Sequence, residues 1–510
     1  MQDEVIAFLK SPDGHPGGGP VEVVQTHGAL VFLAGDVALK IKREVRYDYM
    51  DLSTLDLREA MLRRELELNK PTAPKIYQAV VAITRTPDGG LAVGGAGQPV
   101  EWALQMWRFP AEAELAVIAE TKGIDDGLAD DLGVSVCAFH EKLAPRTVDG
   151  AQLIADILDE LDRVFADMTD VLGAPLIDRF HTDSRRMLAQ ITPLLQRRGR
   201  AGHVRRCHGD LHLRNLVMLD GKPVPFDALE FDEVLGTCDV LYDLAFLIMD
   251  LRHRGLDRAA NMVLNAYLLA GLGQEDEGLA ALPLFLGVRA AIRAMVLVQS
   301  AAASGAKPDP EAVLFMTEAI TYLTPVPATL VLVGGLSGSG KTTVSRALAP
   351  LIGVAPGAVH LRSDLERKAM HRSRASTPPP IETYSANARD SVYNRVFARA
   401  RAILATGHSV LLDATFLNPD HRLNANAVAE ISGATLHRLW LDAPLPVLID
   451  RVRARTGDAS DADEAVVLVQ SGAATKPEGW QVVSADGSVS ETILRAQRSI
   501  SLGAGSSAPS

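Results

Sequence analysis

The sequence predicts two different folds in one chain, an α+β region followed by an α/β region with a parallel sheet. Short β-prone runs with one helical pattern occupy residues 22–109, and the apolar spacing is then mostly helical up to residue 324. Beyond the Pro- and Gly-containing residues 303–327, β-prone runs alternate with helical patterns, as in a parallel sheet with helical crossovers. A chain of 510 residues is long enough for about three domain-sized units.

In the first region, Gly-containing turns separate the β-prone runs, and Ser53 or Thr54 is placed to cap the helix. The helical part is interrupted around residues 207–231 by the short runs "NLVML" and "VPFDALEF". We therefore expect a bilobal arrangement, with a small β-lobe and a larger helical lobe. The expected strands are residues 22–27, 29–35, 37–42, 76–84 and 100–109, and the expected helix is residues 53–69.

In the second region, four β-prone runs are each followed by a helical pattern, at residues 329–334, 358–364, 409–415 and 434–443. The predicted domains are residues 1–324 and 325–500, followed by a disordered tail at 501–510. "STPPP" at 376–380 is expected to be a mobile loop. Few contacts are expected to cross the joint near residue 325, so the two halves should be separable.

The amino-acid composition of the chain argues against several classes of protein. A net charge of −12 without a block of like charges argues against a nucleic-acid binder. The three cysteines form no CxxC pair, which favours a reducing compartment. No secretory signal is visible at the start, and charged residues break the two most apolar stretches, at 241–251 and 284–299. A cytoplasmic protein without a membrane partner is expected.

The first chemical motif is "CHGDLHLRNL" at 207–216, in which His208, Asp210 and Asn215 follow the spacing H-x-D-x-x-x-x-N of a kinase catalytic loop. In that loop the aspartate orients the substrate hydroxyl or accepts its proton, and the asparagine holds Mg²⁺. Asp227, at the end of a short strand, offers a second magnesium carboxylate. As a set, these residues predict phosphoryl transfer.

Upstream, "VALK" makes Lys40 the candidate for pairing with nucleotide phosphates, and Glu65 on the following helix is its candidate partner. Lys42 lies on the same strand face as Lys40 and competes for this role. Glu67 competes with Glu65 more weakly, because residues two apart on a helix point to different sides.

The stretch "CHGDLHLRNL", followed by "FDALEFDEVLGTCDVLYDLA", resembles the aminoglycoside phosphotransferase and choline kinase group, and the resemblance covers residues 20–320. The resemblance implies a kinase-like bilobal fold, a catalytic Asp210, magnesium ligands at Asn215 and Asp227, and a structural role for Asp243. Gly209 stands where protein kinases carry an arginine, so activation-loop phosphorylation is not expected. No clean G-x-G-x-x-G is present near residues 24–36, and the acceptor cannot be assigned.

The second motif is the P-loop pattern G-x4-G-K-T, directly after a predicted strand and before a predicted helix. Backbone N–H groups of such a loop surround the β-phosphate at a helix N-terminus. Lys341 then neutralises phosphate oxygens, and the Thr342 hydroxyl reaches Mg²⁺. The nucleotide-binding candidates are Gly335, Ser337, Gly338, Ser339, Gly340, Lys341, Thr342 and Thr343.

Residues that follow the predicted strands complete this second site. Asp364 is placed to face the γ-phosphate and an acceptor hydroxyl, and Asp413 is a magnesium ligand or a strand-end turn residue. Arg451, Arg453 and Arg455 form a lid over the nucleotide or an exposed basic helix face. Together, "GLSGSGKTT", "SD..RK", "LLDATF", "HR" and "RTGDASDA" resemble the small P-loop kinases of the zeta-toxin, gluconate-kinase and polynucleotide-kinase group over residues 328–500.

The chain thus resembles bacterial fusions of an aminoglycoside-phosphotransferase-like domain and an AAA-type P-loop domain. The resemblance implies a bifunctional ATP- and Mg²⁺-dependent phosphotransferase for small-molecule hydroxyl acceptors. Asp210, Asp364, Arg451 and Arg455 are its catalytic candidates. The alternative is that the P-loop half is a nucleotide-gated regulatory ATPase, and a third reading makes one half a structural remnant.

Overall fold

The computed structural model describes the chain except for residues 1, 17, 48–49, 371–385, 455–461, 474 and 504–510. The chain forms two compact units. Unit 1 comprises Met1–Ile124, Ala138–Gly150 and Gln196–Asp250, and unit 2 comprises Asp125–Cys137, Ala151–Leu195 and Leu251–Ser510. The expected mobile loop at 376–380 lies outside the described residues, as does the expected tail from residue 504 onward.

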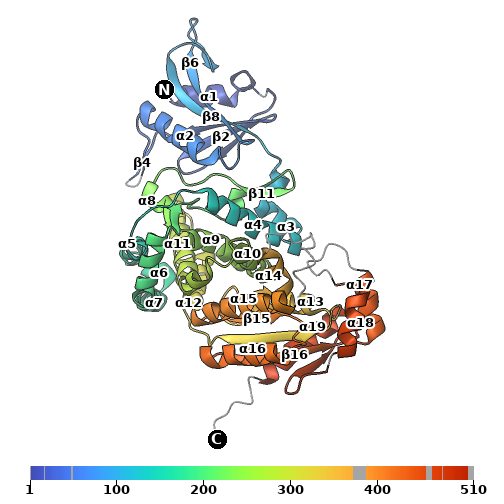
Figure 1. Ribbon diagram of the computed structural model, residues 1–510. Helices are drawn as coiled ribbons and strands as arrows, with labels where there is room; N and C mark the ends of the chain where they lie inside the picture. Colours follow the sequence, from blue (N-terminus) through green and yellow to red (C-terminus); the bar gives the residue numbers. More distant parts are fainter. Residues whose placement is uncertain are drawn as a thin grey trace. The chain divides into compact units, whose positions relative to one another are not determined.

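Unit 1 begins with a six-stranded antiparallel sheet in the order β1-β2-β3-β8-β6-β7 (Figure 1). Thr54 caps the helix α2 (Leu55–Asn69) by accepting a hydrogen bond from the Leu57 N–H, as expected from the sequence. The strands are β1 (Glu22–Gln25), β2 (Ala29–Ala34), β3 (Val37–Lys42), β6 (Tyr77–Arg85), β7 (Leu91–Val93) and β8 (Pro99–Trp107).

The alternation of side chains along β3 decides which residues reach the site. Leu39 and Ile41 are fully buried in one apolar cluster with Val5 and Leu9 of the helix α1 (Gln2–Lys10). Because successive strand residues point to opposite faces, Lys40 and Lys42 lie on the other face, where they contact α2. The sequence did not predict α1.

The remainder of unit 1 carries the loop of the first motif between short strands. β9 (Val204–Arg206) pairs with β12 (Thr237–Asp239), and β10 (Leu216–Leu219) pairs with β11 (Lys222–Pro225). The unit also contains the short elements η1 (Pro12–Gly14), β4 (Arg46–Tyr47), β5 (Met50–Asp51), η2 (Ala111–Ala113), α3 (Leu115–Thr121), η3 (Leu213–Asn215), α8 (Glu233–Gly236) and the first residues of α9 (Val240–His253).

Unit 2 combines helices with a parallel sheet. The helices before residue 324 that lie wholly or mostly in unit 2 are α4 (Asp126–Lys142), α5 (Gly150–Phe165), α6 (Thr169–Leu172), α7 (Ala174–Ala201), α10 (Asp257–Ala270), η4 (Asp276–Ala281), α11 (Leu282–Ser304) and α12 (Pro310–Tyr322). Among the described residues, the stretch Asp276–Ser304 is long and apolar enough to cross a membrane by length and composition alone, with a mean hydropathy of 1.8. Because 61% of its most apolar window is buried within the protein, it matches the core helix of a globular protein equally well.

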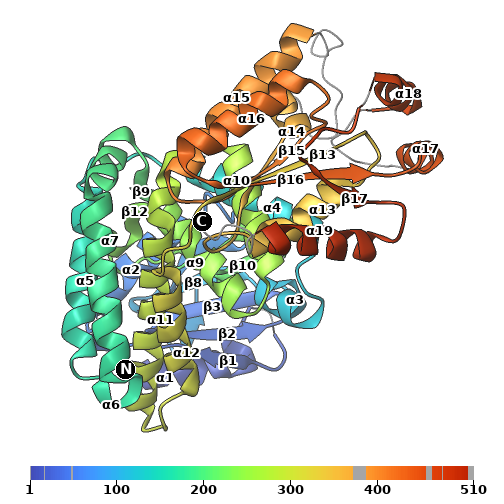
Figure 2. The same ribbon diagram turned by 90° about the horizontal axis from the view of Figure 1, so that it is seen from below.

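The sheet of unit 2 has the order β14-β15-β13-β16-β17, and all of its strand pairs are parallel. Figure 2 shows α15 and α16 along one face of this sheet and α13 and α19 along the other. The predicted fold class, an α+β region followed by an α/β region with a parallel sheet, is therefore confirmed. The strands are β13 (Thr329–Gly335), β14 (Val359–Arg362), β15 (Val410–Asp413), β16 (Thr435–Asp442) and β17 (Gln481–Ser484), the last of which was not predicted.

Helices follow the strands as expected from the alternation in the sequence. They are α13 (Lys341–Leu348), α14 (Ser363–Met370), α15 (Ala386–Ala405), α16 (Pro419–Ser432), α17 (Leu445–Arg453), α18 (Glu464–Ala473) and α19 (Val489–Gly503), with the short η5 (Ala349–Leu351) after α13. Since α19 continues to Gly503, the first residues of the expected tail belong to a helix.

Polar contacts within unit 2 cross the predicted joint. The Asn265 side chain accepts a hydrogen bond from the His360 N–H at 2.7 Å, and Arg346 donates to Asp130 at 2.9 Å. The expectation that few contacts cross residue 324 is therefore wrong. These contacts could not be predicted from the sequence, because each of the side chains is polar and polar side chains usually lie on a solvated surface.

Candidate functional site

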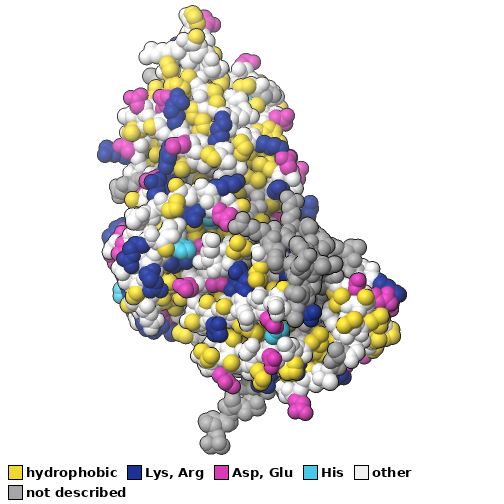
Figure 3. Space-filling view, in the orientation of Figure 1, with side chains coloured by type: hydrophobic (Ala, Val, Ile, Leu, Met, Phe, Trp, Pro, Cys, Tyr) yellow, Lys and Arg dark blue, Asp and Glu magenta, His cyan; other side chains and the backbone are white. Residues whose placement is uncertain are grey.

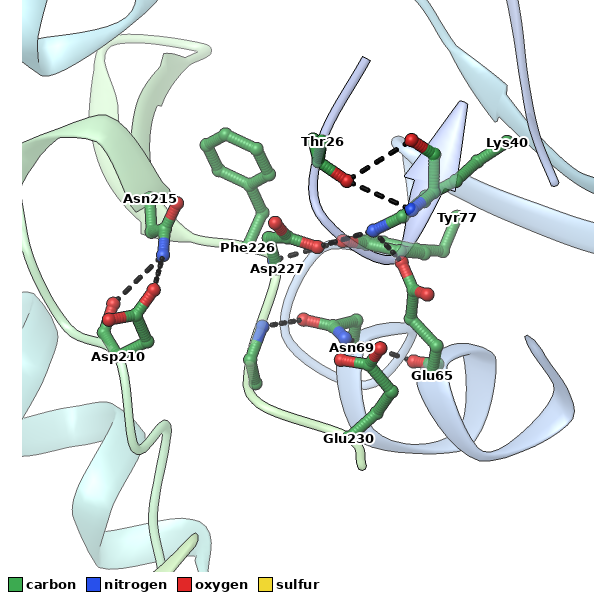
Figure 4. Close-up of polar contacts among 12 residues, drawn as sticks. Thr26, Lys40, Glu65, Asn69, Tyr77, Asp210, Asn215, Phe226, Asp227 and Glu230 are labelled. Atoms are coloured by element: carbon green, nitrogen blue, oxygen red, sulfur yellow. Dashed lines mark hydrogen bonds and ion pairs between the residues drawn. The ribbon is translucent and has the colours of Figure 1, made fainter. Parts of the chain in front are cut away.

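The first candidate site lies in unit 1, where β3 and α2 hold a network of buried charges (Figure 4). Lys40 Nζ donates to Glu65 Oε1 at 2.7 Å and to Asp227 Oδ1 at 2.8 Å. Glu65 is fully buried. Burial disfavours the charged form of Lys40, but Asp227 and Glu65 outweigh it and raise the pKa of Lys40 well above its usual value. Lys40 is therefore a fixed positive charge.

The two competing residues have different positions. Lys42 Nζ lies 2.7 Å from Glu65 Oε2 and 2.5 Å from Glu230 Oε1, so both lysines share Glu65. Glu67 pairs with Arg64 on the exposed side of α2 and does not join the network. Of the two lysines, it is Lys40 that contacts Asp227, the predicted magnesium ligand.

Backbone contacts hold Asp227 in an unusual conformation. Its φ is +60°, in the left-handed region that non-glycine residues rarely adopt. The Asp227 N–H donates to the Tyr77 hydroxyl at 2.9 Å, and the next N–H, of Ala228, donates to Asn69 Oδ1 at 2.8 Å. Glu230, Tyr77 and Asn69 were not predicted to belong to the site. A signal for Glu230 was available, since a second lysine on the same strand face needs a second carboxylate when buried.

The predicted catalytic loop brings Asp210 and Asn215 together. Asn215 Nδ2 donates to Asp210 Oδ2 at 2.8 Å and to the Asp210 carbonyl at 2.9 Å. Figure 4 shows this pair separated from the Lys40 network by the segment that carries Phe226 and Asp227. The contact fixes the Asp210 carboxylate and uses the Asn215 amide nitrogen, so the Asn215 amide oxygen is a group that can bind a metal ion.

Asp243 fixes the start of the same loop. Its carboxylate accepts the Gly209 N–H at 2.8 Å and the His208 N–H at 3.1 Å, and it also contacts His140 Nε2 at 3.1 Å. Gly209 has a φ of +83° here, which an arginine would rarely adopt. Burial lowers the pKa of His208 below its usual value, and its Nε2 contacts the Phe226 carbonyl at 2.8 Å. His208 thus links the loop to the strand end before Asp227.

The second candidate site is the P-loop at the end of β13, in unit 2. Gly335, Gly338 and Gly340 have φ values of +140°, +84° and +87°. A Cβ at Gly338 would lie 2.6 Å from the Leu448 carbonyl, so the loop backbone packs directly against α17. Of the predicted nucleotide-binding residues, Ser337, Gly338, Gly340, Lys341, Thr342 and Thr343 line one pocket.

The same pocket is lined by Asp364 and Asp413, as the sequence predicted, and by Ser363 and Thr415. The Thr342 hydroxyl donates to Asp413 Oδ2 at 2.7 Å. Burial alone favours protonation of Asp413, but His360, Arg362 and Lys341 outweigh it and hold its pKa well below the usual value. Asp413 is therefore a carboxylate next to the Thr342 hydroxyl in the pocket lining.

The remaining predicted residues have other surroundings. Gly335 and Ser339 are not among the residues that line the pocket, and Ser339 Oγ is buried with no hydrogen-bond partner among the described residues. Arg451 on α17 donates to the Gly487 carbonyl at 3.3 Å, and Arg453 pairs with Glu464. Neither arginine lines the pocket. Arg455 lies outside the described residues.

Taken together, the strand, loop and helix around Lys341 define a P-loop domain, and the family model described as "AAA domain" matches residues 330–477. The chain as a whole belongs to the family of the uncharacterized protein Rv2004c of Mycobacterium tuberculosis (strain ATCC 25618 / H37Rv) and Mb2027c of Mycobacterium bovis. It is 30% identical to each over 457 residues, which cover 87% of this chain and 88% of each relative.

Two solved structures are each similar to part of the chain. A gluconokinase from Sinorhizobium meliloti 1021 is 21% identical, with a TM-score of 0.26, over 36% of this chain and 99% of its own. A choline/ethanolamine kinase family protein from Mesorhizobium loti is 16% identical, with a TM-score of 0.39, over 64% of this chain and 95% of its own.

Proposed function

We propose that the chain is an ATP-dependent phosphotransferase for small-molecule hydroxyl acceptors, with two separate ATP–Mg²⁺ sites. The observation that carries the proposal is the simultaneous contact of Lys40 with Glu65 and Asp227. A buried strand lysine paired with a helix carboxylate, next to a candidate metal carboxylate, is the arrangement that protein kinases use for phosphoryl transfer. The strand-loop-helix around Lys341 supports the second site.

In the first site, Asp210 receives the proton of the acceptor hydroxyl while the hydroxyl oxygen bonds to the γ-phosphorus of ATP. The bond between that phosphorus and the β–γ bridging oxygen breaks, and ADP leaves. Lys40 holds the phosphates, and the contact between Asn215 and Asp210 orients the carboxylate toward the acceptor.

The side chains present fit Mg²⁺, which binds carboxylate and amide oxygens. Asn215 and Asp227 would hold it in the first site, and Thr342 and Asp413 in the second. When bound, the ion neutralises charge on the phosphate oxygens.

In the second site, the loop N–H groups and Lys341 bind the phosphates, and Asp364 faces the acceptor. Asp364 shares the pocket with Lys341, and its side chain is 31% exposed, so an acceptor can reach it. Arg451 and Arg455 stay predictions, because no contact of the described residues brings them to the pocket.

A second candidate function is that the P-loop half is a nucleotide-gated regulator of the first half. The buried contact of Arg399 with Asp276 and Glu366 favours it, because Glu366 lies two residues after Asp364. This contact connects the helix that carries the pocket residue Asp364 to Asp276, which precedes the predicted joint.

The test is a screen of hydroxyl compounds with the intact chain and Mg-ATP, read by mass spectrometry as the gain of one phosphoryl group. Asp210→Asn should lower transfer at the first site by about 10²–10⁴-fold while ATP still binds. Lys341→Ala should remove only the products of the second site. Acceptor-independent ATP hydrolysis that Lys341→Ala abolishes would favour the regulatory function, and unchanged transfer by Asp210→Asn would contradict the first assignment.

A further inference from the structure

The P-loop donates one of its backbone N–H groups to a side chain from another helix. Gln470 on α18 accepts a hydrogen bond from the Ser337 N–H through Oε1, at 2.9 Å. Ser337 lines the same pocket as Lys341 and Thr342. No motif in the sequence marked Gln470, which follows Ser337 by 133 positions in the chain.

The packing of α18 explains why Gln470 reaches the loop. Val467, one helical turn earlier, is fully buried in a small cluster with Leu448 and Val452 of α17, and Leu336 of the loop packs against this cluster. Residues three apart lie on the same side of a helix, so Gln470 faces the loop next to Val467. The opposite side of α18 is apolar and exposed at Val469, which is 74% exposed. Figure 3 shows yellow hydrophobic atoms at the surface where Figure 1 draws α17 and α18.

One N–H group cannot serve two acceptors at full strength. Loop N–H groups are the donors with which a P-loop binds phosphate oxygens. A phosphate oxygen is charged, and hydrogen bonds to charged acceptors are roughly twice as strong as hydrogen bonds to a neutral amide oxygen. A nucleotide phosphate at Ser337 is therefore the stronger competitor.

The loop itself has little freedom to avoid this competition. Its backbone at Gly338 is so close to Leu448 that a Cβ would lie 2.6 Å from the Leu448 carbonyl. Gln470, in contrast, is a half-buried side chain with several rotatable bonds on a helix anchored by a small apolar cluster. The exchange of partners is accommodated by Gln470 and not by the loop.

From these contacts we propose that Gln470 is a positioning residue displaced by phosphate, so that α18 responds to a nucleoside di- or triphosphate in the pocket. The Gln470 amide holds the Ser337 N–H, and binding of the nucleotide transfers this N–H to a phosphate oxygen and releases the side chain. The inference rests on the proposed function of the Lys341 loop as a nucleotide site.

The test measures binding of Mg-ATP, Mg-ADP and adenosine to the full chain carrying Lys40→Ala, so that only the second site contributes. Gln470→Ala should tighten binding of both phosphorylated nucleotides by about two- to tenfold, because the competing hydrogen bond is lost. Gln470→Glu should weaken it by about tenfold or more, since a carboxylate is a stronger acceptor and repels phosphate. Adenosine should bind all variants alike. Val469→Ala, which alters the exposed side of α18, is the matched control.

A second measurement does not depend on a substitution. Hydrogen exchange across α18 in the Lys40→Ala chain should become faster when Mg-ATP binds, because the contact that anchors Gln470 is lost. Weaker Mg-ATP binding by Gln470→Ala, or slower exchange in α18 on binding, would show that Gln470 holds the nucleotide, and either result overturns the inference. If the Lys40→Ala chain binds no nucleotide, or if adding Lys341→Ala leaves binding unchanged, the proposed function of the loop fails instead.

Discussion

Arg399 on α15 binds Asp276 of η4 through a pair of hydrogen bonds, Nε to Oδ2 at 2.7 Å and Nη2 to Oδ1 at 2.8 Å. Both side chains are buried, and the same guanidinium donates to the buried Glu366. Because Asp276 precedes the predicted joint and Glu366 follows it, this arginine connects the two sides within unit 2. The pair of parallel hydrogen bonds is the strongest geometry available to an arginine and a carboxylate.

Arg399→Met should destabilise the protein strongly, because Asp276 is then left as a buried carboxylate without its arginine, whereas Glu366 keeps its contact with Arg395. Breaking a buried pair by removing one partner costs about 3–5 kcal/mol. Urea unfolding of the full chain measures this loss. The control is Arg453→Met, which removes an exposed pair with Glu464 and should cost no more than about 1 kcal/mol. Equal losses from the two substitutions would mean that Arg399 does not stabilise unit 2 as described.

Substitutions of the two β3 lysines should separate nucleotide binding from stability. Of the two lysines, Lys40 is the one that contacts Asp227. Lys40→Met should therefore lower transfer at the first site by about 10²-fold or more. Lys42→Met leaves Glu230 unpaired, so its main effect should be a lower melting temperature with residual transfer. Transfer assays and thermal unfolding of both variants check this. If Lys42→Met abolishes transfer in a folded protein while Lys40→Met does not, the roles are reversed.

The Thr342 hydroxyl should matter only when Mg²⁺ is present. Its hydrogen bond to Asp413 places both oxygens at one side of the Lys341 pocket, as a shared magnesium site requires. Thr342→Val should weaken Mg-ATP binding by about tenfold and leave binding of ATP in a chelator nearly unchanged. Titrations with and without Mg²⁺ in the Lys40→Ala chain give the comparison, and Thr435→Val, at the exposed start of β16 and outside the pocket lining, is the control. An equal loss in both titrations would argue against a metal ligand at Thr342.

His253 should make stability depend on pH. Burial tends to lower the pKa of His253, but hydrogen bonds to Glu318 and Glu311 outweigh it and raise that pKa above the usual 6.5. A raised pKa in the folded state means that the stabilisation is fully present below pH 6.5 and is lost as the pH rises through the folded-state value.

The wild type should therefore have a higher melting temperature than His253→Gln, and the difference should be larger at about pH 6 than at about pH 9. Thermal unfolding at the two values measures the difference. Phe315→Leu removes the ring that stacks on His253, with the two ring centroids 3.7 Å apart. This substitution should lower the melting temperature about equally at both pH values. A difference in melting temperature between the wild type and His253→Gln that grows with pH would contradict a raised pKa of His253 in the folded state.

Much of the site could be predicted from the sequence because its key residues lie at fixed spacings on regular elements. Alternation along β3 put Lys40 and Lys42 on one face, and the spacing from Asp210 to Asn215 corresponds to an observed contact at 2.8 Å. The P-loop could be recognised because its glycines, Lys341 and Thr342 are consecutive or nearly so. Local patterns of this kind do not depend on the rest of the fold.

Contacts between distant parts of the chain could not be predicted in this way. Tyr77 lies 150 positions from Asp227, and Gln470 lies 133 positions from Ser337, so no local pattern relates them. The contacts across the joint were missed for a second reason. Asp276 and Arg399 are charged residues of the kind that usually lies on a solvated surface, and only tertiary packing makes them a buried pair.

The most direct test of the account is the number of Mg-ATP molecules that bind one chain, measured by isothermal titration calorimetry. We expect two sites per chain in the wild type, about one in Lys40→Ala, about one in Lys341→Ala, and none in the double variant. Circular dichroism of each variant establishes that it is folded. A single site in the folded wild type, removed by one of these substitutions and untouched by the other, would contradict the claim of two separate ATP sites.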